Sequence, residues 1–337
     1  MRMEIPKTTE LAQKVFAISN EKELCQIALD LFRFQYYNNP VYRQFCNVID
    51  KKPEKVVAWE QIPFLPISFF KTHPVVSFEG QPQVTFKSSG TTASTPSNHF
   101  VKEKAIYQKS FLLAFQKFYG SVADYCILGL LPSYLERGDS SLVFMVKELI
   151  ERSGHPQSGF YLYEHDQLAR ALKAVEAAGQ KTLMIGVTYA LLDFAKQHRL
   201  NLQHTIIMET GGMKGRGKEL VRSEVHHILK NAFGVDAIHS EYGMTELLSQ
   251  AYAIQEGRFN APPWMKVLIR DETDPLSTIT SKDAIVSGAI NIIDLANIYS
   301  CSFIATEDMG RLHPDGSFEV LGRMDNSDVR GCSLMTA

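Results

Sequence analysis

The sequence predicts an α/β fold, a mainly parallel sheet covered by helices on both faces, with an antiparallel β appendage. The first observation is that short apolar segments alternate with amphipathic, glycine-terminated segments between residues 102 and 240. The second is that this alternation stops near residue 284, after which β-type segments follow one another directly. Parallel strands need crossover helices between them, and the first region supplies such helices.

The N-terminal region is predicted to be helical and then irregular. Apolar residues recur at helical spacing from Glu21 to Tyr37, where Asn20 is placed to cap the helix and the sequence NNP at 38–40 ends it. The proline-rich segment EQIPFLPISFFKTHPVVSF follows, and it is expected to lie extended against the core.

The alternating region contains five expected helices and four expected strands. Asp139 and Asp166 are the expected N-caps of the second and third helices. The helices are expected at 102–119, 140–154, 167–179, 189–198 and 218–234, and the strands at 125–131, 182–187, 205–209 and 235–240. Beyond them, β segments are expected at 284–295 and 302–306, and the sequence Pro314-Asp315-Gly316 is expected to form a hairpin turn into a last strand.

Composition and charge exclude several classes of protein. The 337 residues are 45% hydrophobic and 21% charged, which is ordinary for a globular chain. A net charge of −2 argues against nucleic acid as a partner, and no apolar run approaches the roughly 20 residues that span a bilayer. The cysteines are scattered without a CxxC pair, so they are expected to be reduced thiols of a cytoplasmic protein. They are Cys25, Cys46, Cys126, Cys301 and Cys332.

A hydroxyl-rich loop, KSSGTTASTP, occupies residues 87–96. Hydroxyls and backbone N–H groups around a glycine can line an anion pocket, because glycine allows close approach of the backbone. The loop lacks the GxxxxGK[ST] pattern of a P-loop, and a mobile polar connection is the alternative interpretation. The candidate phosphate-binding residues are Ser88, Ser89, Gly90, Thr91 and Thr92.

A second segment, HSEYGMTE at 239–246, follows an expected strand end, where α/β sheets place their ligands. Tyr242 can stack on a planar ring, Gly243 keeps the backbone close, Thr245 offers a hydroxyl and Glu246 an oxygen ligand for Mg²⁺. The alternative is a simple connection in which Thr245 caps a helix beginning ELLSQAYA.

Three shorter pieces add weaker signals. Gly211 and Gly212 directly follow a strand, so they mark either a tight turn or a surface that lies flat against a ring. Asp308 can accept hydrogen bonds from the two hydroxyls of a ribose, or it is a carboxylate on a surface loop. Arg323 follows a predicted strand and can pair with phosphate or hydroxyl oxygens.

The order of these motifs resembles that of the adenylate-forming superfamily, which includes acyl-CoA synthetases, luciferases and peptide-synthetase adenylation domains. SSGTT and YGMTE together carry this resemblance, which covers roughly residues 85–331. The stretches LLPSYLERGDSSLVFMVKELI, METGGMKGRGKEL and GRMDNSDVRGCSLM narrow it to the acyl-protein synthetases of bacterial luciferase operons. The resemblance implies the fold of the large N-terminal domain of these enzymes, without a C-terminal lid domain.

The resemblance also implies a role for each candidate residue, with ATP and Mg²⁺ as cofactors. Ser88 to Thr92 would cradle the phosphates, and Gly211, Gly212 and Tyr242, with Gly243 beside them, would hold adenine. Thr245 would contact the α-phosphate, Glu246 would bind Mg²⁺, and Asp308 and Arg323 would hold the ribose. The implied organisation is a helical N-terminal region at 1–80, an adenylate-forming core at 81–325 and a tail at 326–337.

The sequence departs from the superfamily pattern in three ways. Ser97 and Asn98 follow Pro96, where many members have a lysine, and the ribose motif reads Thr-Glu-Asp rather than Thr-Gly-Asp. The lysine that a lid would contribute is also missing, and Lys87 and Lys214 are candidate substitutes. In the resembled family a cysteine near the C-terminus accepts the acyl group, and here Cys332 takes that position, with Arg330 nearby to favour the thiolate.

The sequence therefore predicts an acid–thiol ligase. It would activate a carboxylic acid, a long-chain fatty acid by resemblance, to acyl-AMP and transfer the acyl group to a cysteine thiol for a partner acyl reductase. Two alternatives stay open: a ligase that transfers an acyl or aryl group to CoA or a carrier protein, and a non-catalytic nucleotide-binding subunit.

Overall fold

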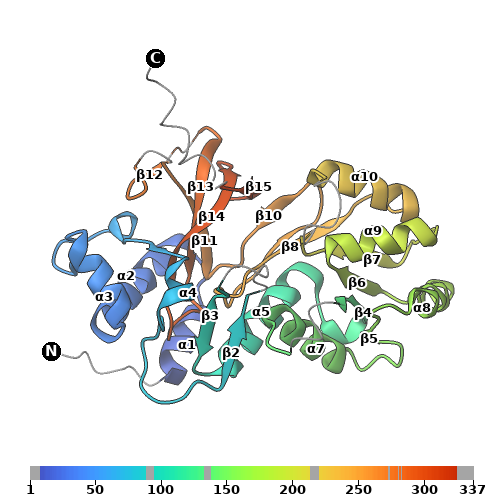
Figure 1. Ribbon diagram of the computed structural model, residues 1–337, viewed down its shortest axis with the longest axis horizontal. Helices are drawn as coiled ribbons and strands as arrows, with labels where there is room; N and C mark the ends of the chain where they lie inside the picture. Colours follow the sequence, from blue (N-terminus) through green and yellow to red (C-terminus); the bar gives the residue numbers. More distant parts are fainter. Residues whose placement is uncertain are drawn as a thin grey trace.

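The computed structural model of the chain describes residues 8–88, 95–132, 138–212, 220–271, 274–279, 281 and 283–324. Within these residues one sheet of 13 strands runs through the molecule, and helices flank it (Figure 1). The strand order is β12-β11-β13-β14-β15-β10-β9-β8-β7-β6-β4-β5, with β1 paired to β14. The predicted α/β class is confirmed.

One half of the sheet is parallel and buried on both faces. Every residue of β4 and β6 is buried, as expected for strands covered on both sides. In Figure 1, helices α9 and α10 lie above these strands, and α5 and α7 lie below them. The parallel strands are β4 (Cys126–Leu130), β5 (Gly159–Phe160), β6 (Thr182–Gly186), β7 (Thr205–Glu209) and β8 (His239–Tyr242). The helices are α5 (Lys104–Tyr119), α7 (Ser141–Ser153), α8 (His165–Ala177), α9 (Thr188–Gln197) and α10 (Arg222–Phe233), and the 3₁₀ turn η2 spans Val122–Asp124.

The other half of the sheet is antiparallel and continues the first half. The chain reverses between β8 and β9, whose residues Tyr242 and Ala251 pair, so the antiparallel strands share the sheet with the parallel ones. The predicted hairpin joins β14 to β15, with Leu312 opposite Phe318. These strands are β9 (Ala251–Ala253), β10 (Arg258–Asn260), β11 (Met265–Arg270), β12 (Thr278–Ile279), β13 (Val286–Asp294), β14 (Phe303–Leu312) and β15 (Phe318–Arg323).

Helices from the N-terminal region pack against the antiparallel half. The buried side chain of Gln35 on α2 donates to the carbonyl of Asn297 at 2.8 Å, and Asn39 donates to the carbonyl of Ser300 at 3.1 Å. These bonds fix the turn that follows β13. The elements are α1 (Thr8–Phe16), α2 (Glu21–Asn38), α3 (Pro40–Val48), η1 (Trp59–Gln61), β1 (Leu65–Pro66) and α4 (Phe69–Thr72), followed by the hairpin of β2 (Val84–Lys87) and β3 (Asn98–Val101).

Helix caps were predicted correctly in one case and wrongly in two. The Asn20 side chain accepts from the N–H of Glu23 at 3.0 Å, as predicted. Asp139 is not the cap of α7, because the neighbouring Ser140 hydroxyl accepts from the N–H of Val143 instead. Asp166 is not a cap either, because α8 has already begun at His165.

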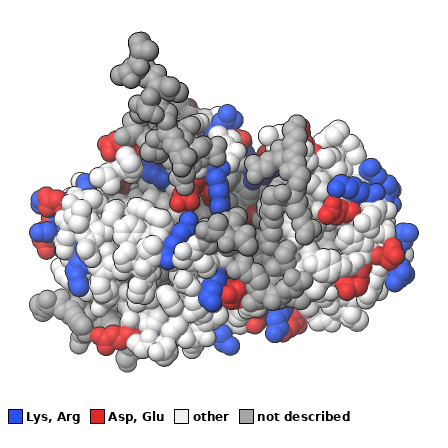
Figure 2. Space-filling model, in the orientation of Figure 1, with Lys and Arg blue, Asp and Glu red and all other residues white. Residues whose placement is uncertain are grey.

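Acidic and basic side chains are interspersed over the described part of the face in Figure 2. Within the described part of the chain, no helix has both the length and the apolar character needed to cross a bilayer.

Candidate functional site

Two of the predicted motifs lie at the same edge of the sheet. Strands β7 and β8 are parallel neighbours, with Glu209 opposite Ser240. Gly211 and Gly212 follow β7, and the YGMTE segment spans the end of β8, so both are at the carboxyl ends of adjacent strands. Open α/β sheets bind their ligands at such strand ends.

The two ends of the hydroxyl-rich loop, which together we call its base, are hydrogen-bonded to each other. Lys87 pairs with Asn98 in the β2–β3 hairpin. Beyond this pair, the N–H of Ser88 donates to the Ser97 carbonyl at 3.1 Å, and the N–H of Ser97 donates to the Ser88 hydroxyl at 2.8 Å. The remaining predicted phosphate-binding residues, Ser89, Gly90, Thr91 and Thr92, lie outside the described residues.

Glu246 lies beside this base, about 150 residues away in sequence. Its side chain is buried, and the Ser97 side chain lies close enough to lower the pKa of its carboxyl. Burial raises the pKa of its carboxyl, and the smaller influences of Ser97, Arg323 and Lys71 act in the opposite direction. The predicted Mg²⁺ ligand and the base of the predicted phosphate loop are therefore neighbours. Lys71, on α4, was not predicted from the sequence.

The backbone of the Thr245–Glu246 pair is held by two side chains that were also not predicted. Nδ1 of His99 lies 2.8 Å from the Thr245 carbonyl, and since a carbonyl can only accept, Nδ1 carries the proton. Nδ2 of Asn297 donates to the Glu246 carbonyl at 2.8 Å. Both side chains are fully buried.

The helix that Thr245 was expected to cap does not form. Residues 246–253, all within the described range, form turns and then β9. The buried carboxylate of Asp294 accepts from the N–H groups of Leu248 and Ser249 at 2.7 and 3.0 Å. These N–H groups are therefore unavailable for helical bonds, and this alternative interpretation is wrong.

Tyr242, Asp308 and Arg323 form a second group at the site. The Tyr242 hydroxyl donates to Oδ2 of Asp308 at 2.8 Å, and Nε of Arg323 lies 3.6 Å from Oδ1 of the same carboxylate. Asp308 and Arg323 are also opposite each other in the β14–β15 pair. Burial raises the pKa of Asp308, and the Tyr242 hydrogen bond and the Arg323 charge oppose that rise.

Aromatic packing fixes the Tyr242 ring. Its centroid lies 5.8 Å from that of Phe259 and 5.5 Å from that of Phe318, and the ring is buried. Gly243 follows it, and a Cβ at this position would lie 2.4 Å from Oε1 of Glu241. A side chain at position 243 would therefore displace the buried Glu241 carboxyl.

The glycine pair requires the conformational freedom of glycine. Gly211 and Gly212 have φ values of 73° and 91°, which side chains rarely tolerate. Their carbonyls accept from the N–H groups of Thr188 and Tyr189, at the start of α9. Both interpretations of the pair, a tight turn and contact with an adenine ring, stay predictions, because residues 213–219 lie outside the described residues.

Glu209, the last residue of β7, is a buried carboxylate that the sequence did not single out. Burial would raise its pKa, but the partners around it outweigh this effect and lower the pKa to about 2. It accepts from Gly211 N–H at 2.7 Å, Ser240 at 2.9 Å, Thr188 at 3.0 Å and Arg222 at 3.3 Å, with His226 at 3.7 Å.

The described cysteines are poorly suited to nucleophilic chemistry. Three of them are buried, and burial raises the pKa of the thiol in each; Cys25 is half-buried, and burial raises its pKa as well. Cys332, the predicted acyl acceptor, lies outside the described residues, as does Lys214.

The donor set fits a magnesium ion that arrives with ATP. Among the described residues, no three His, Cys, Asp or Glu side chains form a metal site by themselves. Mg²⁺ bound to a nucleotide needs only one or two carboxylates, since phosphates and water supply its other ligands. The single carboxylate of Glu246 is therefore sufficient for such an ion.

Comparisons with known proteins agree with the predicted resemblance. No family model matches the chain. The chain is 21% identical over 362 aligned residues to the long-chain-fatty-acid–luciferin-component ligase of Vibrio harveyi, with 98% of this chain and 93% of the relative covered. Solved structures that are similar include a long-chain-fatty-acid-CoA ligase from Archaeoglobus fulgidus (15% identity, TM-score 0.47) and the O-succinylbenzoate coenzyme A synthetase from Bacillus subtilis in complex with AMP (18% identity, TM-score 0.47).

The extent of these matches differs. The two solved structures match 71% and 72% of this chain, and the chain spans 51% and 49% of their length. The curated relative, in contrast, is matched along almost its whole length. The resemblance to the acyl-protein synthetases is therefore confirmed, and the chain is a relative of the Vibrio harveyi long-chain-fatty-acid–luciferin-component ligase.

Proposed function

We propose that the protein is an ATP-dependent acid–thiol ligase that activates a fatty acid as acyl-AMP and transfers the acyl group to a cysteine. One observation carries this proposal: the buried Glu246 carboxyl lies against Ser97, at the base of the hydroxyl-rich loop. A cation ligand and a phosphate loop are thus adjacent at a strand end. The name of the Vibrio harveyi relative supports a long-chain fatty acid as the substrate.

ATP would bind across the two groups of residues. Ser88 to Thr92 would contact the phosphates through hydroxyls and backbone N–H groups. Gly211, Gly212 and Tyr242, with Gly243 beside them, would contact adenine. Asp308 would accept from the ribose hydroxyls, and Arg323, which reaches solvent beside it, would donate to ribose or phosphate oxygens. The side chain of Arg323 is 81% exposed, so it is free to move onto a ligand.

The first step is adenylation. A carboxylate oxygen of the acid attacks the α-phosphorus of MgATP, and the bond from this phosphorus to the bridging oxygen breaks. Pyrophosphate leaves with the electron pair. Glu246 would hold the Mg²⁺ that travels with ATP, and Thr245 would donate its hydroxyl to the α-phosphate, so that the charge developing on the phosphate oxygens is stabilised.

The second step transfers the acyl group. The thiolate of Cys332 attacks the carbonyl carbon of acyl-AMP, a C–S bond forms, the C–O bond to phosphate breaks and AMP leaves. The thiol has lost its proton to solvent beforehand, and at an ordinary pKa of about 8.5 a few per cent of it is thiolate at pH 7. The thioester would then be delivered to a partner acyl reductase in the cytoplasm.

Intact-mass measurement tests both steps together. Wild-type protein with ATP, Mg²⁺ and palmitate should gain the mass of one palmitoyl group, and hydroxylamine at neutral pH should remove it, as expected of a thioester. Cys332→Ser should lack the adduct, while Cys25→Ser, the control at the half-buried cysteine of α2, should keep it.

Three outcomes would overturn the proposal in part or in whole. An adduct that persists in Cys332→Ser would contradict the cysteine assignment. Acid-dependent consumption of CoA without any adduct would instead identify a CoA ligase. If neither an adduct nor CoA consumption occurs, even with an acyl reductase present, the protein is a non-catalytic nucleotide-binding subunit.

A further inference from the structure

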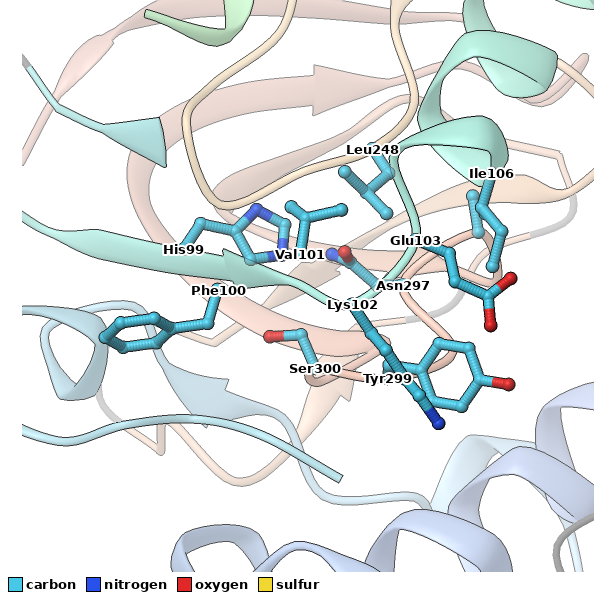
Figure 3. Close-up of a pocket in the computed structure, with 11 residues that line it drawn as sticks. His99, Phe100, Val101, Lys102, Glu103, Ile106, Leu248, Asn297, Tyr299 and Ser300 are labelled. Carbon is cyan, nitrogen blue, oxygen red and sulfur yellow. The ribbon is translucent and has the colours of Figure 1, made fainter. Parts of the chain in front are cut away.

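A small cavity is lined in part by His99 and Asn297, the two side chains that hold the Thr245–Glu246 pair. It is bounded by β3, by the segment after β8 and by the turn after β13, and its volume is about 10 Å³. This is close to the space that one water molecule requires. In Figure 3 the His99 ring and the Asn297 amide point toward one another across it. Leu248 and Ala296 form part of the apolar wall.

The hydrogen bonds at this cavity lack one donor. Nδ1 of His99 donates to the Thr245 carbonyl, which leaves Nε2 of a neutral ring as an acceptor. Nδ2 of Asn297 donates to the Glu246 carbonyl, which leaves Oδ1 as a second acceptor. Both atoms are buried and have no hydrogen-bond partner among the described residues.

A second proton on the ring is one way to supply the donor, since the nearby Asn297 side chain raises the pKa of His99. Burial opposes it, because it lowers the pKa of His99 to about 4. At neutral pH the ring is therefore neutral, and both acceptors lack a donor among the described residues. An unsatisfied buried acceptor costs roughly 1–3 kcal/mol, whereas one water can donate a proton to each of them.

We propose that His99 and Asn297 are positioning residues for the Thr245–Glu246 pair, bridged by one buried water that donates to Nε2 of His99 and Oδ1 of Asn297. This inference rests on the proposed function, because the bridge would position the two residues that act on MgATP in that function, Thr245 and Glu246.

The bridge acts through the two peptide planes that flank Glu246. The Thr245 carbonyl lies in the plane before its Cα, and the Glu246 carbonyl lies in the plane after it. Holding both carbonyls fixes φ and ψ of Glu246 and so the direction of its side chain. Asn297 is itself held, because its carbonyl accepts from Gln35 of α2 at 2.8 Å. The position of the cation ligand is thus set by side chains remote in sequence.

A matched pair of substitutions at His99 tests the positioning role. In His99→Asn the amide nitrogen can take the place of Nδ1 and still donate to Thr245. In His99→Gln the amide reaches the place of Nε2 instead. Pyrophosphate–ATP exchange should fall about 10–100-fold in His99→Gln, mainly in kcat, and should recover most of that loss in His99→Asn. His239→Asn is the control, since His239 lies at the opposite end of β8 and also has its pKa lowered to about 4 by burial.

Thermal unfolding identifies variants that are merely destabilised. If His99→Asn and His99→Gln lose exchange equally, or if His239→Asn loses as much, the positioning role is overturned. The same holds if only the KM for ATP changes.

The ring tautomer gives a readout that does not depend on activity. Nitrogen-15 NMR of histidine-labelled full-length protein, with His99 assigned from the His99→Asn spectrum, should find the proton on Nδ1. A proton on Nε2 would overturn the inference even in an active enzyme. If the wild type has no exchange activity, the proposed function fails, and the NMR result still decides the hydrogen-bond arrangement.

Discussion

The adjacent strands β7 and β8 each lead to a buried glutamate, and the two glutamates have different surroundings. Glu209 accepts hydrogen bonds from four donors, of which Arg222 is cationic, and its pKa is lowered to about 2. Glu246 is equally buried, but its partners are weaker and its pKa is raised. Burial opposes the charge at both positions, so the partners decide the outcome.

We infer from this difference that Glu209 serves structure, and it agrees with the proposed role of Glu246 in the chemistry. The lone pairs of Glu209 are occupied within the folded chain, and a metal ion would have to displace them. No basic side chain among the described residues forms an ion pair with Glu246, and a bound Mg²⁺ would supply the missing positive charge. Exchanging each carboxylate for its neutral amide therefore separates the two roles.

The largest expected effect is on catalysis, from Glu246→Gln. Pyrophosphate–ATP exchange should fall about 10²–10³-fold, because a ligand of the substrate's Mg²⁺ is lost. The free energy of unfolding at pH 7 should stay the same or rise, since a neutral amide is less costly to bury there than a carboxylate. Glu151→Gln, on the exposed face of α7, serves as the control. Exchange within a few-fold of wild type would remove Glu246 from the mechanism.

The next effect is on stability, from Glu209→Gln. Because the folded protein holds the Glu209 pKa near 2 rather than at 4.5, the ionised carboxylate stabilises the fold by about 3 kcal/mol at neutral pH. This contribution is present above pH 4.5 and is lost as the pH falls toward 2. Urea unfolding should show that difference between wild type and variant at pH 7 and a smaller one at pH 3. A difference that does not change with pH would contradict the assignment.

Tyr242→Phe should have a smaller effect on stability. It removes the only donor described for Oδ2 of Asp308, and an unpaired buried acceptor costs about 1–3 kcal/mol. The pKa of Asp308 should also rise further, because the Tyr242 hydrogen bond lowers it. When the solution is acidified, the KM for ATP should therefore begin to rise at a higher pH in the variant than in the wild type. An unchanged pH profile would separate Tyr242 from the nucleotide.

The smallest effect on stability is expected for Arg323→Ala. Its pair with Asp308 is largely exposed to solvent, so its loss should cost under about 1 kcal/mol. The KM for ATP should nevertheless rise about 10-fold, the order expected for one charge-assisted hydrogen bond. If ATP binding is unchanged, Arg323 is only a surface residue of β15.

Local sequence patterns predicted the helices of the alternating region correctly, but not the strands β9 to β12. Strand β7 has the predicted bounds 205–209, Asn20 caps α2, and the hairpin lies where Pro314-Asp315-Gly316 placed it. The expectation failed at 246–253, because the acceptor that prevents a helix there, Asp294, is more than 40 residues away. Periodicity contains no information on such a partner.

In the candidate site, too, residues within local motifs were predicted, and residues that act on distant segments of the chain were missed. The residue types that would touch ATP were evident from two ordered motifs, SSGTT and YGMTE. The residues that position them were not evident, because His99 and Asn297 belong to no motif and act through backbone carbonyls. Glu209 was missed for a related reason, since its partners come from four separate segments of the chain.

The account depends on the ability of this strand edge to form an acyl adenylate. Pyrophosphate–ATP exchange with wild-type protein, with and without a long-chain fatty acid, measures that step without any acceptor thiol. We expect exchange that requires both Mg²⁺ and the fatty acid, that persists in Cys332→Ser and that is lost in Glu246→Gln. Exchange that is absent with the acid present, or unaffected by Glu246→Gln, would contradict the account.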